Sequence, residues 1–72
     1  MIEIISDISG LVLEVHVKAG DSVKKGQELI ILESIKMEIP IKTKQAGKIL
    51  DVKVKEEDLV GEGQVIALLE PE

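Results

Sequence analysis

The sequence contains an internal repeat that spans nearly the whole chain. Residues 8–33 align without a gap over residues 45–70, an offset of 37, and 11 of these 26 positions are identical. The identical pairs are Gly10/Gly47, Leu13/Leu50, Val15/Val52, Val17/Val54, Lys18/Lys55, Asp21/Asp58, Val23/Val60, Gly26/Gly63, Gln27/Gln64, Leu32/Leu69 and Glu33/Glu70. Such self-similarity indicates two copies of one structural unit.

The repeat predicts how the chain is divided. The same offset extends to the start of the chain, so residues 1–33 correspond to residues 38–70, and only the four residues 34–37 have no counterpart. We therefore expect a single domain over residues 1–72, with repeat halves 1–33 and 38–70 and a hairpin tip at 34–37. Neither half is long enough to cover its own apolar face, so both should share one core.

Each copy reads as short strands rather than helices. Leu13, Val15 and Val17 alternate with polar residues, and the same alternation recurs in the second copy, a period of two that is typical of half-buried strands. Ile and Val, which suit pleated sheets, supply 19 of the 72 residues. The sequence predicts an all-β domain of about eight strands, in two four-stranded sheets related by a pseudo-twofold axis. The pairs expected to be buried are Val15/Val52, Val17/Val54 and Leu32/Leu69.

Composition argues against several classes of function. The net charge is −5 and there is no Phe, Tyr or Trp, so the chain lacks the basic field and stacking platform of a nucleic-acid-binding protein. No apolar run approaches 18 residues and no export signal opens the chain, so we expect no membrane contact and a cytoplasmic location. With no cysteine and only His16, we expect neither a metal site nor a catalytic site.

The unmatched segment contains one lysine in an unusual setting. Lys36 is flanked by Ile35 and Met37, apolar residues that a solvated loop has no reason to prefer. If Ile35 and Lys36 are the central residues of a tight type I′ hairpin, both need a positive φ, which a β-branched isoleucine tolerates badly. The pattern indicates that something recognises this tip.

The stretch Glu33-Ser34-Ile35-Lys36-Met37 resembles the biotin-attachment motif Glu-Ala/Ser-Met-Lys-Met of the biotinyl/lipoyl family, and the likeness covers essentially the whole chain. It departs from the motif at Ile35, where the family usually has methionine. The resemblance implies a flattened barrel or sandwich, a barrel-sandwich hybrid. It also implies that Lys36 carries covalent biotin and that Glu33, Ser34, Ile35 and Met37 serve in recognition of the tip.

The same resemblance implies a carrier without catalysis of its own. Its partners would be a biotin protein ligase, a biotin carboxylase and a carboxyltransferase, and its role would lie in acyl-CoA carboxylation of the acetyl-CoA carboxylase type. The first alternative is a lipoyl carrier of a 2-oxoacid dehydrogenase-type complex, with lipoate on Lys36. The second is an unmodified adaptor sandwich.

Overall fold

The structure is a computed structural model that describes residues 1–72 as eight strands and no helix. The strands are β1 (Ile2–Ile5), β2 (Gly10–Val15), β3 (Ser22–Val23), β4 (Glu28–Ser34), β5 (Met37–Lys42), β6 (Gly47–Val52), β7 (Leu59–Val60) and β8 (Val65–Pro71). β2, β3 and β4 recur as β6, β7 and β8 at the offset of 37 found in the sequence, and β5 matches β1 with two residues added at its start. The chain has no helix that could cross a membrane.

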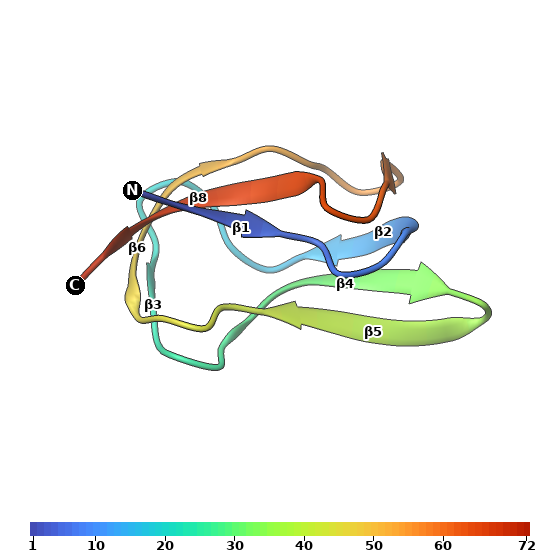
Figure 1. The fold of residues 1–72 in the computed structure, drawn as a ribbon, viewed down its shortest axis with the longest axis horizontal. Coiled ribbons are helices and arrows are strands. Elements are labelled where there is room, and N and C mark those ends of the chain that lie inside the picture. Colours follow the sequence, from blue (N-terminus) through green and yellow to red (C-terminus); the bar gives the residue numbers. More distant parts are fainter.

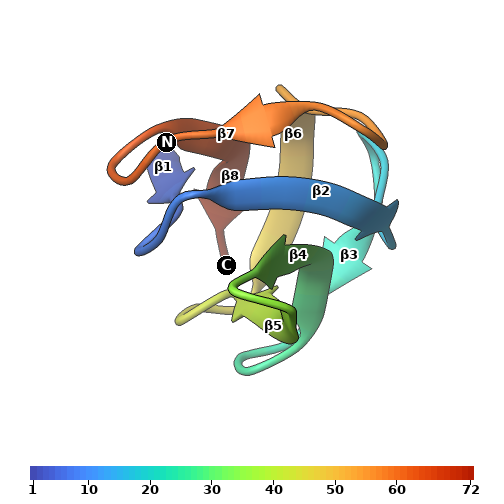
Figure 2. The same ribbon diagram turned by 90° about the vertical axis from the view of Figure 1, so that its right-hand side faces the viewer.

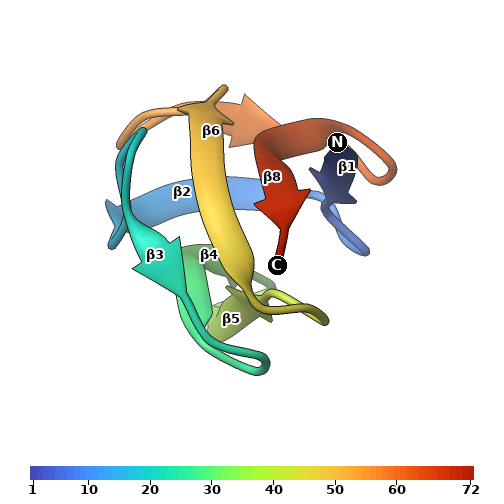
Figure 3. The same cartoon turned by 90° about the vertical axis from the view of Figure 1, so that its left-hand side faces the viewer.

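The two copies interleave to form the sheets. One sheet has the order β1-β8-β6-β3 and the other β5-β4-β2-β7, and all neighbours are antiparallel. Figure 3 shows the first sheet, and Figure 2, seen from the opposite end, shows the second. Each sheet therefore takes two strands from each copy. The predicted pair of four-stranded sheets is confirmed.

The core lies between the sheets and is made by equivalent residues of the two copies. Fourteen apolar residues are buried, and the largest fully buried side chains come mainly from the central strands β4 and β8. The predicted pairs Val17/Val54 and Leu32/Leu69 are buried. Val15 and Val52 are only half-buried and pack against the edge of the core.

A bulge explains where the predicted alternation fails. The pairing register shifts between Val12 and Glu14 in β2, and at the equivalent place in β6. Leu13 and Leu50 are the extra residues, and a bulged residue leaves the regular alternation of faces. Leu50 is consequently 42% exposed, whereas Val12, one residue before the bulge, is buried.

Two buried hydroxyl groups stabilise equivalent bends in the two copies. Ser6 Oγ donates a hydrogen bond to the Ile8 carbonyl at 2.6 Å, and Thr43 Oγ1 donates to the Gln45 carbonyl at 2.7 Å. Each hydroxyl oxygen also accepts a bond from the N–H of that same second residue. These two are the only buried polar side chains, so the twofold relation extends to polar positions that are not identical in sequence.

The molecule is elongated along one axis. Its principal extents are 34 × 18 × 18 Å. The β4–β5 hairpin projects from one end, while both chain ends lie at the other (Figure 1). Residues 34–37 are therefore presented as far as possible from the chain ends.

Candidate functional site

The candidate site is the turn of the β4–β5 hairpin. Ser34 and Met37 form the last pair of the ladder, so the turn consists of only Ile35 and Lys36. Ile35 has a φ of 51° and Lys36 a φ of 60°, as a type I′ turn requires. This turn matches the right-handed twist of the strands it joins. The conformation expected for Ile35 and Lys36 is confirmed.

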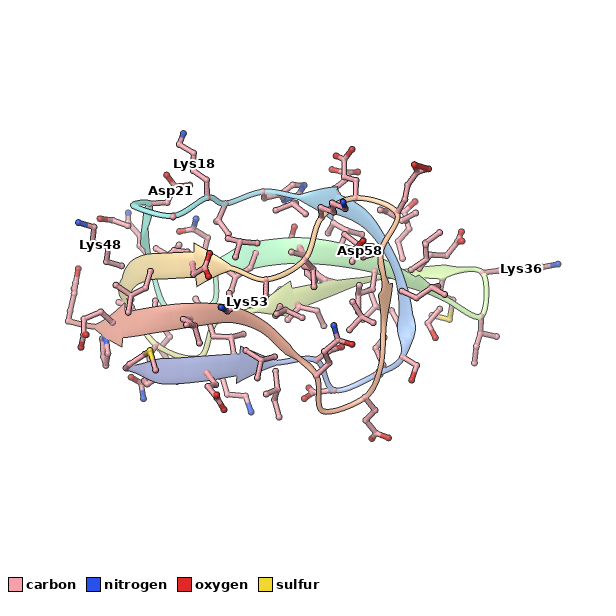
Figure 4. All side chains as sticks on the ribbon, turned by 90° about the horizontal axis from the view of Figure 1, so that it is seen from above. Lys18, Asp21, Lys36, Lys48, Lys53 and Asp58 are labelled. Carbon is pink, nitrogen blue, oxygen red and sulfur yellow. The ribbon has the colours of Figure 1, made fainter.

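The hairpin directs Lys36 away from the body of the molecule. In Figure 4 its side chain extends beyond the end of the sandwich, roughly along the long axis. None of the four ion pairs in the structure involves Lys36, so no neighbouring carboxylate holds its amine. The side chain is available to a large partner from most directions.

The residues beside Lys36 place apolar and acidic groups at the same tip. Ile35 is 91% exposed and Met37 is 62% exposed. Ser34 is half-buried, and Glu33 lies exposed and directly opposite Glu38. Two carboxylates facing each other across a ladder destabilise a hairpin slightly. The tip thus combines features that do not favour folding, which fits a surface that is recognised.

Sequence reasoning did not identify Glu38 as part of this site. Its position follows from the hairpin register, because a two-residue turn that pairs Ser34 with Met37 must pair Glu33 with Glu38. The signal was therefore present once the turn length was known. All five residues predicted for the site, 33–37, lie together at the tip.

The one polar residue outside the tip that the sequence singled out, His16, lies away from Lys36. His16 Nε2 is 2.7 Å from Glu14 Oε1 on the exposed strand end. In the second copy Lys53 Nζ lies 2.9 Å from Asp51 Oδ2, and the hydrogen bond and positive charge of Lys53 lower the pKa of Asp51. The structure has two surface hollows, one including Ile5 and the other including Val17, and neither is lined by residues 33–38. The tip is a presented arm rather than a cleft that could enclose a substrate.

Comparison with protein families gives a match over almost the whole chain. The family model described as "Biotin-requiring enzyme" matches residues 2–69. Among curated proteins, the Biotin/lipoyl attachment protein of Bacillus subtilis (strain 168) is 58% identical over 40 residues, which are 56% of this chain and 55% of that protein. The Biotinylated protein TB7.3 homolog of Mycobacterium leprae (strain TN) is 50% identical over 42 residues, 58% of this chain and 59% of that protein. The aligned segments thus span a little over half of these relatives.

Solved structures show the same fold within much larger proteins. The Kluyveromyces lactis urea carboxylase matches 94% of this chain with a TM-score of 0.88 and 26% identity, although the match covers only 6% of that protein. A single-chain, multi-domain long-chain acyl-CoA carboxylase matches 90% of the chain with a TM-score of 0.83 and 26% identity, again over 6% of its length.

Proposed function

This chain belongs to the biotin/lipoyl attachment family, and from that premise we propose that Lys36 carries covalently attached biotin and presents it as a swinging arm. The observation that carries the proposal is the position of Lys36 in a two-residue hairpin turn, where none of the ion pairs of the structure involves its amine. A relative named as a biotinylated protein supports biotin as the attached group.

The residues of the tip fit covalent attachment. A primary amine forms a stable amide with the valerate carboxyl of biotin once that carboxyl is activated. The activating group and a proton leave as the amide bond forms. An exposed amine beside the exposed apolar side chains of Ile35 and Met37 offers an enzyme both a nucleophile and a contact surface.

The fold determines what the attached group can do. Biotin supplies, when attached, a ureido nitrogen that can carry a carboxyl group. The lysine stem and valerate chain together reach on the order of 10 Å beyond the backbone. The tight hairpin fixes the base of this arm, and fixed elements position a group more accurately than long loops do. The chain acts as a carrier and leaves catalysis to its partners.

The partners we propose are a biotin protein ligase, a biotin carboxylase and a carboxyltransferase. The likeness to domains of a urea carboxylase and an acyl-CoA carboxylase supports this class of assembly. Within it, an acyl-CoA of the acetyl-CoA type is the acceptor that we propose. A carrier tethered near two active sites raises the local concentration of its arm at both.

Peptide mapping after co-expression with a biotin ligase tests the attachment site. We expect biotin on Lys36 and on none of the other eight of the nine lysines. Lys36→Arg should abolish attachment without loss of fold, because arginine keeps the charge and lacks a comparable amine. Lys25→Arg, in another exposed turn, is the matched control and should be modified like the parent. Biotin found on any other lysine contradicts the proposal.

Lipoate is the second candidate, because the relative from Bacillus subtilis is named for both groups. A lipoyl carrier would need the same exposed amine and would serve a 2-oxoacid dehydrogenase-type complex. Intact mass separates the two, since the biotin and lipoyl adducts differ in mass. Co-expression with a biotin ligase and a lipoate ligase together should give the biotin adduct. A lipoyl adduct as the main product would favour the second candidate.

A further inference from the structure

The outer face of the hairpin sheet carries an apolar patch beside the tip. The pairing register aligns one outward-facing row of residues across all four strands, and a second outward-facing row lies two residues further from Lys36 along β4 and β5. The first row is Leu59, Leu11, Glu33 and Glu38, and the second is Glu14, Ile31 and Pro40. Leu59 is 80% exposed, whereas Leu11, Ile31 and Pro40 are half-buried and show only part of their side chains to solvent. We call these four residues the hairpin-side patch.

The internal repeat provides a comparison for this patch within the same molecule. The twofold relation places the outer face of the other sheet in an equivalent environment, near the end opposite Lys36, where Figure 4 labels Lys48. There the residues equivalent to Leu59, Leu11 and Pro40 are Ser22, Lys48 and Glu3, and only Leu68 matches Ile31 in being apolar.

This difference shows whether the fold itself requires apolar residues at these positions. At one end of the molecule the fold accepts Ser22 and Lys48 at the two places where Leu59 and Leu11 stand at the other end. The fold therefore does not require leucine at either position. The side chain of Leu59 is so exposed that its packing against the core contributes little to stability. Exposing it to water costs free energy, so its presence needs an explanation other than folding.

The charges around the patch define what would fit it. Glu14, Glu33 and Glu38 border the apolar residues, while the lysine on β5, Lys42, lies at the far end of the strand opposite Glu28. Exposed acidic groups around an apolar centre resemble the polar rim and desolvated centre of a protein interface. A partner surface would be apolar at its centre and basic at its rim.

We propose that the hairpin-side patch docks the ligase that attaches biotin to Lys36, an inference that rests on the proposed function. The first row of the patch is one ladder step behind the Ser34–Met37 pair that closes the hairpin. An enzyme that acylates Lys36 must draw the amine itself into its active site, so its surface comes against the adjoining sheet. Enzymes that use the finished arm meet its far end, about 10 Å further out.

Steady-state kinetics with purified biotin ligase, biotin and ATP test the docking. The test variant is Leu59→Ser combined with Leu11→Lys, which gives the hairpin sheet the residues of its equivalent face. We expect KM for this carrier to rise about tenfold or more with kcat unchanged, because docking and not the acylation step is weakened. Circular dichroism and thermal unfolding establish that the variant is folded.

Two further variants make the test specific. Ser22→Leu with Lys48→Leu places the same apolar residues on the opposite face, and KM should equal that of the parent. Glu14→Gln should raise KM moderately and reduce its dependence on salt, because a basic rim on the ligase loses one counterpart.

The outcomes distinguish the two proposals. A parent chain biotinylated on Lys36, with a KM that the Leu59→Ser/Leu11→Lys variant leaves unchanged, overturns the docking proposal and leaves the proposed function intact. A fall in kcat at unchanged KM overturns it as well, since the patch would then act on the acylation step. A parent chain that accepts no biotin rejects the proposed function and this inference with it.

Discussion

Ile35 combines a β-branched side chain with a left-handed backbone, a conformation that costs a non-glycine residue about 1–2 kcal/mol. Because it is 91% exposed, the side chain recovers little of this cost by packing. Ile35→Met removes the β-branch, and we expect it to raise the free energy of unfolding by about 0.5 kcal/mol. Ile35→Asn should raise it by about 1 kcal/mol, because asparagine tolerates the left-handed region well. Urea denaturation measures both.

The control for Ile35 is another exposed isoleucine. Ile5 lies in β1 and is not among the residues with positive φ, so Ile5→Asn should destabilise the domain through its poor strand propensity. Equal effects of asparagine at Ile35 and Ile5 would contradict the argument from backbone strain. By resemblance to the usual motif, Ile35→Met should also be biotinylated faster than the parent.

Asp51 gives a prediction for pH. The hydrogen bond and charge of Lys53 lower the pKa of the Asp51 carboxyl in the folded chain below the ordinary value of 3.8. The ion pair therefore contributes to stability above the unfolded-state pKa, and the contribution disappears as pH falls through the lower folded-state pKa. Carbon NMR titration should show a low Asp51 midpoint that Lys53→Met raises and Lys55→Met leaves unchanged. An Asp51 midpoint that Lys53→Met leaves unchanged would refute this account.

At the scale of strands, two glycines hold neighbouring strands close together. A Cβ built on Gly10 would lie 2.7 Å from the Glu33 carbonyl oxygen, and one built on Gly47 would collide with the Glu70 carbonyl. Both contacts are with backbone, so neither can be relieved by a side-chain movement. Gly10→Ala and Gly47→Ala should each lower the free energy of unfolding by about 1–3 kcal/mol, measured by urea denaturation.

These two alanine variants should differ in function. Gly10 lies against the backbone of β4 at the residue before Ser34, whereas Gly47 lies against the backbone of β8 at the opposite end. We therefore expect Gly10→Ala to slow biotinylation of Lys36 and Gly47→Ala to leave its rate unchanged, under conditions where both variants are folded. Equal rates in the two variants would show that β4 absorbs the displacement before it reaches the tip.

Strand positions could be predicted from the sequence, but the faces of some residues could not. The repeat located Lys36 at a joint between copies, and the turn length follows from the pairing of Ser34 with Met37. The bulge at Leu13 and Leu50 could not be read from the alternation, because an extra residue in one strand is set by its partner strand. The exposure of Leu59 could not be predicted for the same reason, because the face on which it lies depends on its pairing with Leu11.

At the scale of the whole molecule, the interleaved sheets make the two halves dependent on each other. β1 and β3 find their neighbours β8 and β6 in the other copy. Fragments 1–36 and 37–72, made separately, should each lack a cooperative unfolding transition, and an equimolar mixture should recover the β-sheet circular dichroism of the intact chain. A sharp transition in either fragment alone would contradict this dependence.

The twofold relation also has a consequence for the two chain ends. Ile2 pairs with Leu69 as Ile39 pairs with Leu32, so the gap between the ends occupies the place that the Lys36 turn occupies in the hairpin. Replacing residues 71–72 by a second Ser-Ile-Lys-Met and joining it to Met1 would close the backbone into a ring. Opened instead at the turn between Lys25 and Gly26, this permuted chain should fold as a two-headed carrier. Mass spectrometry over time should find the new head biotinylated more slowly than Lys36, because the sheet behind it bears Ser22 and Lys48.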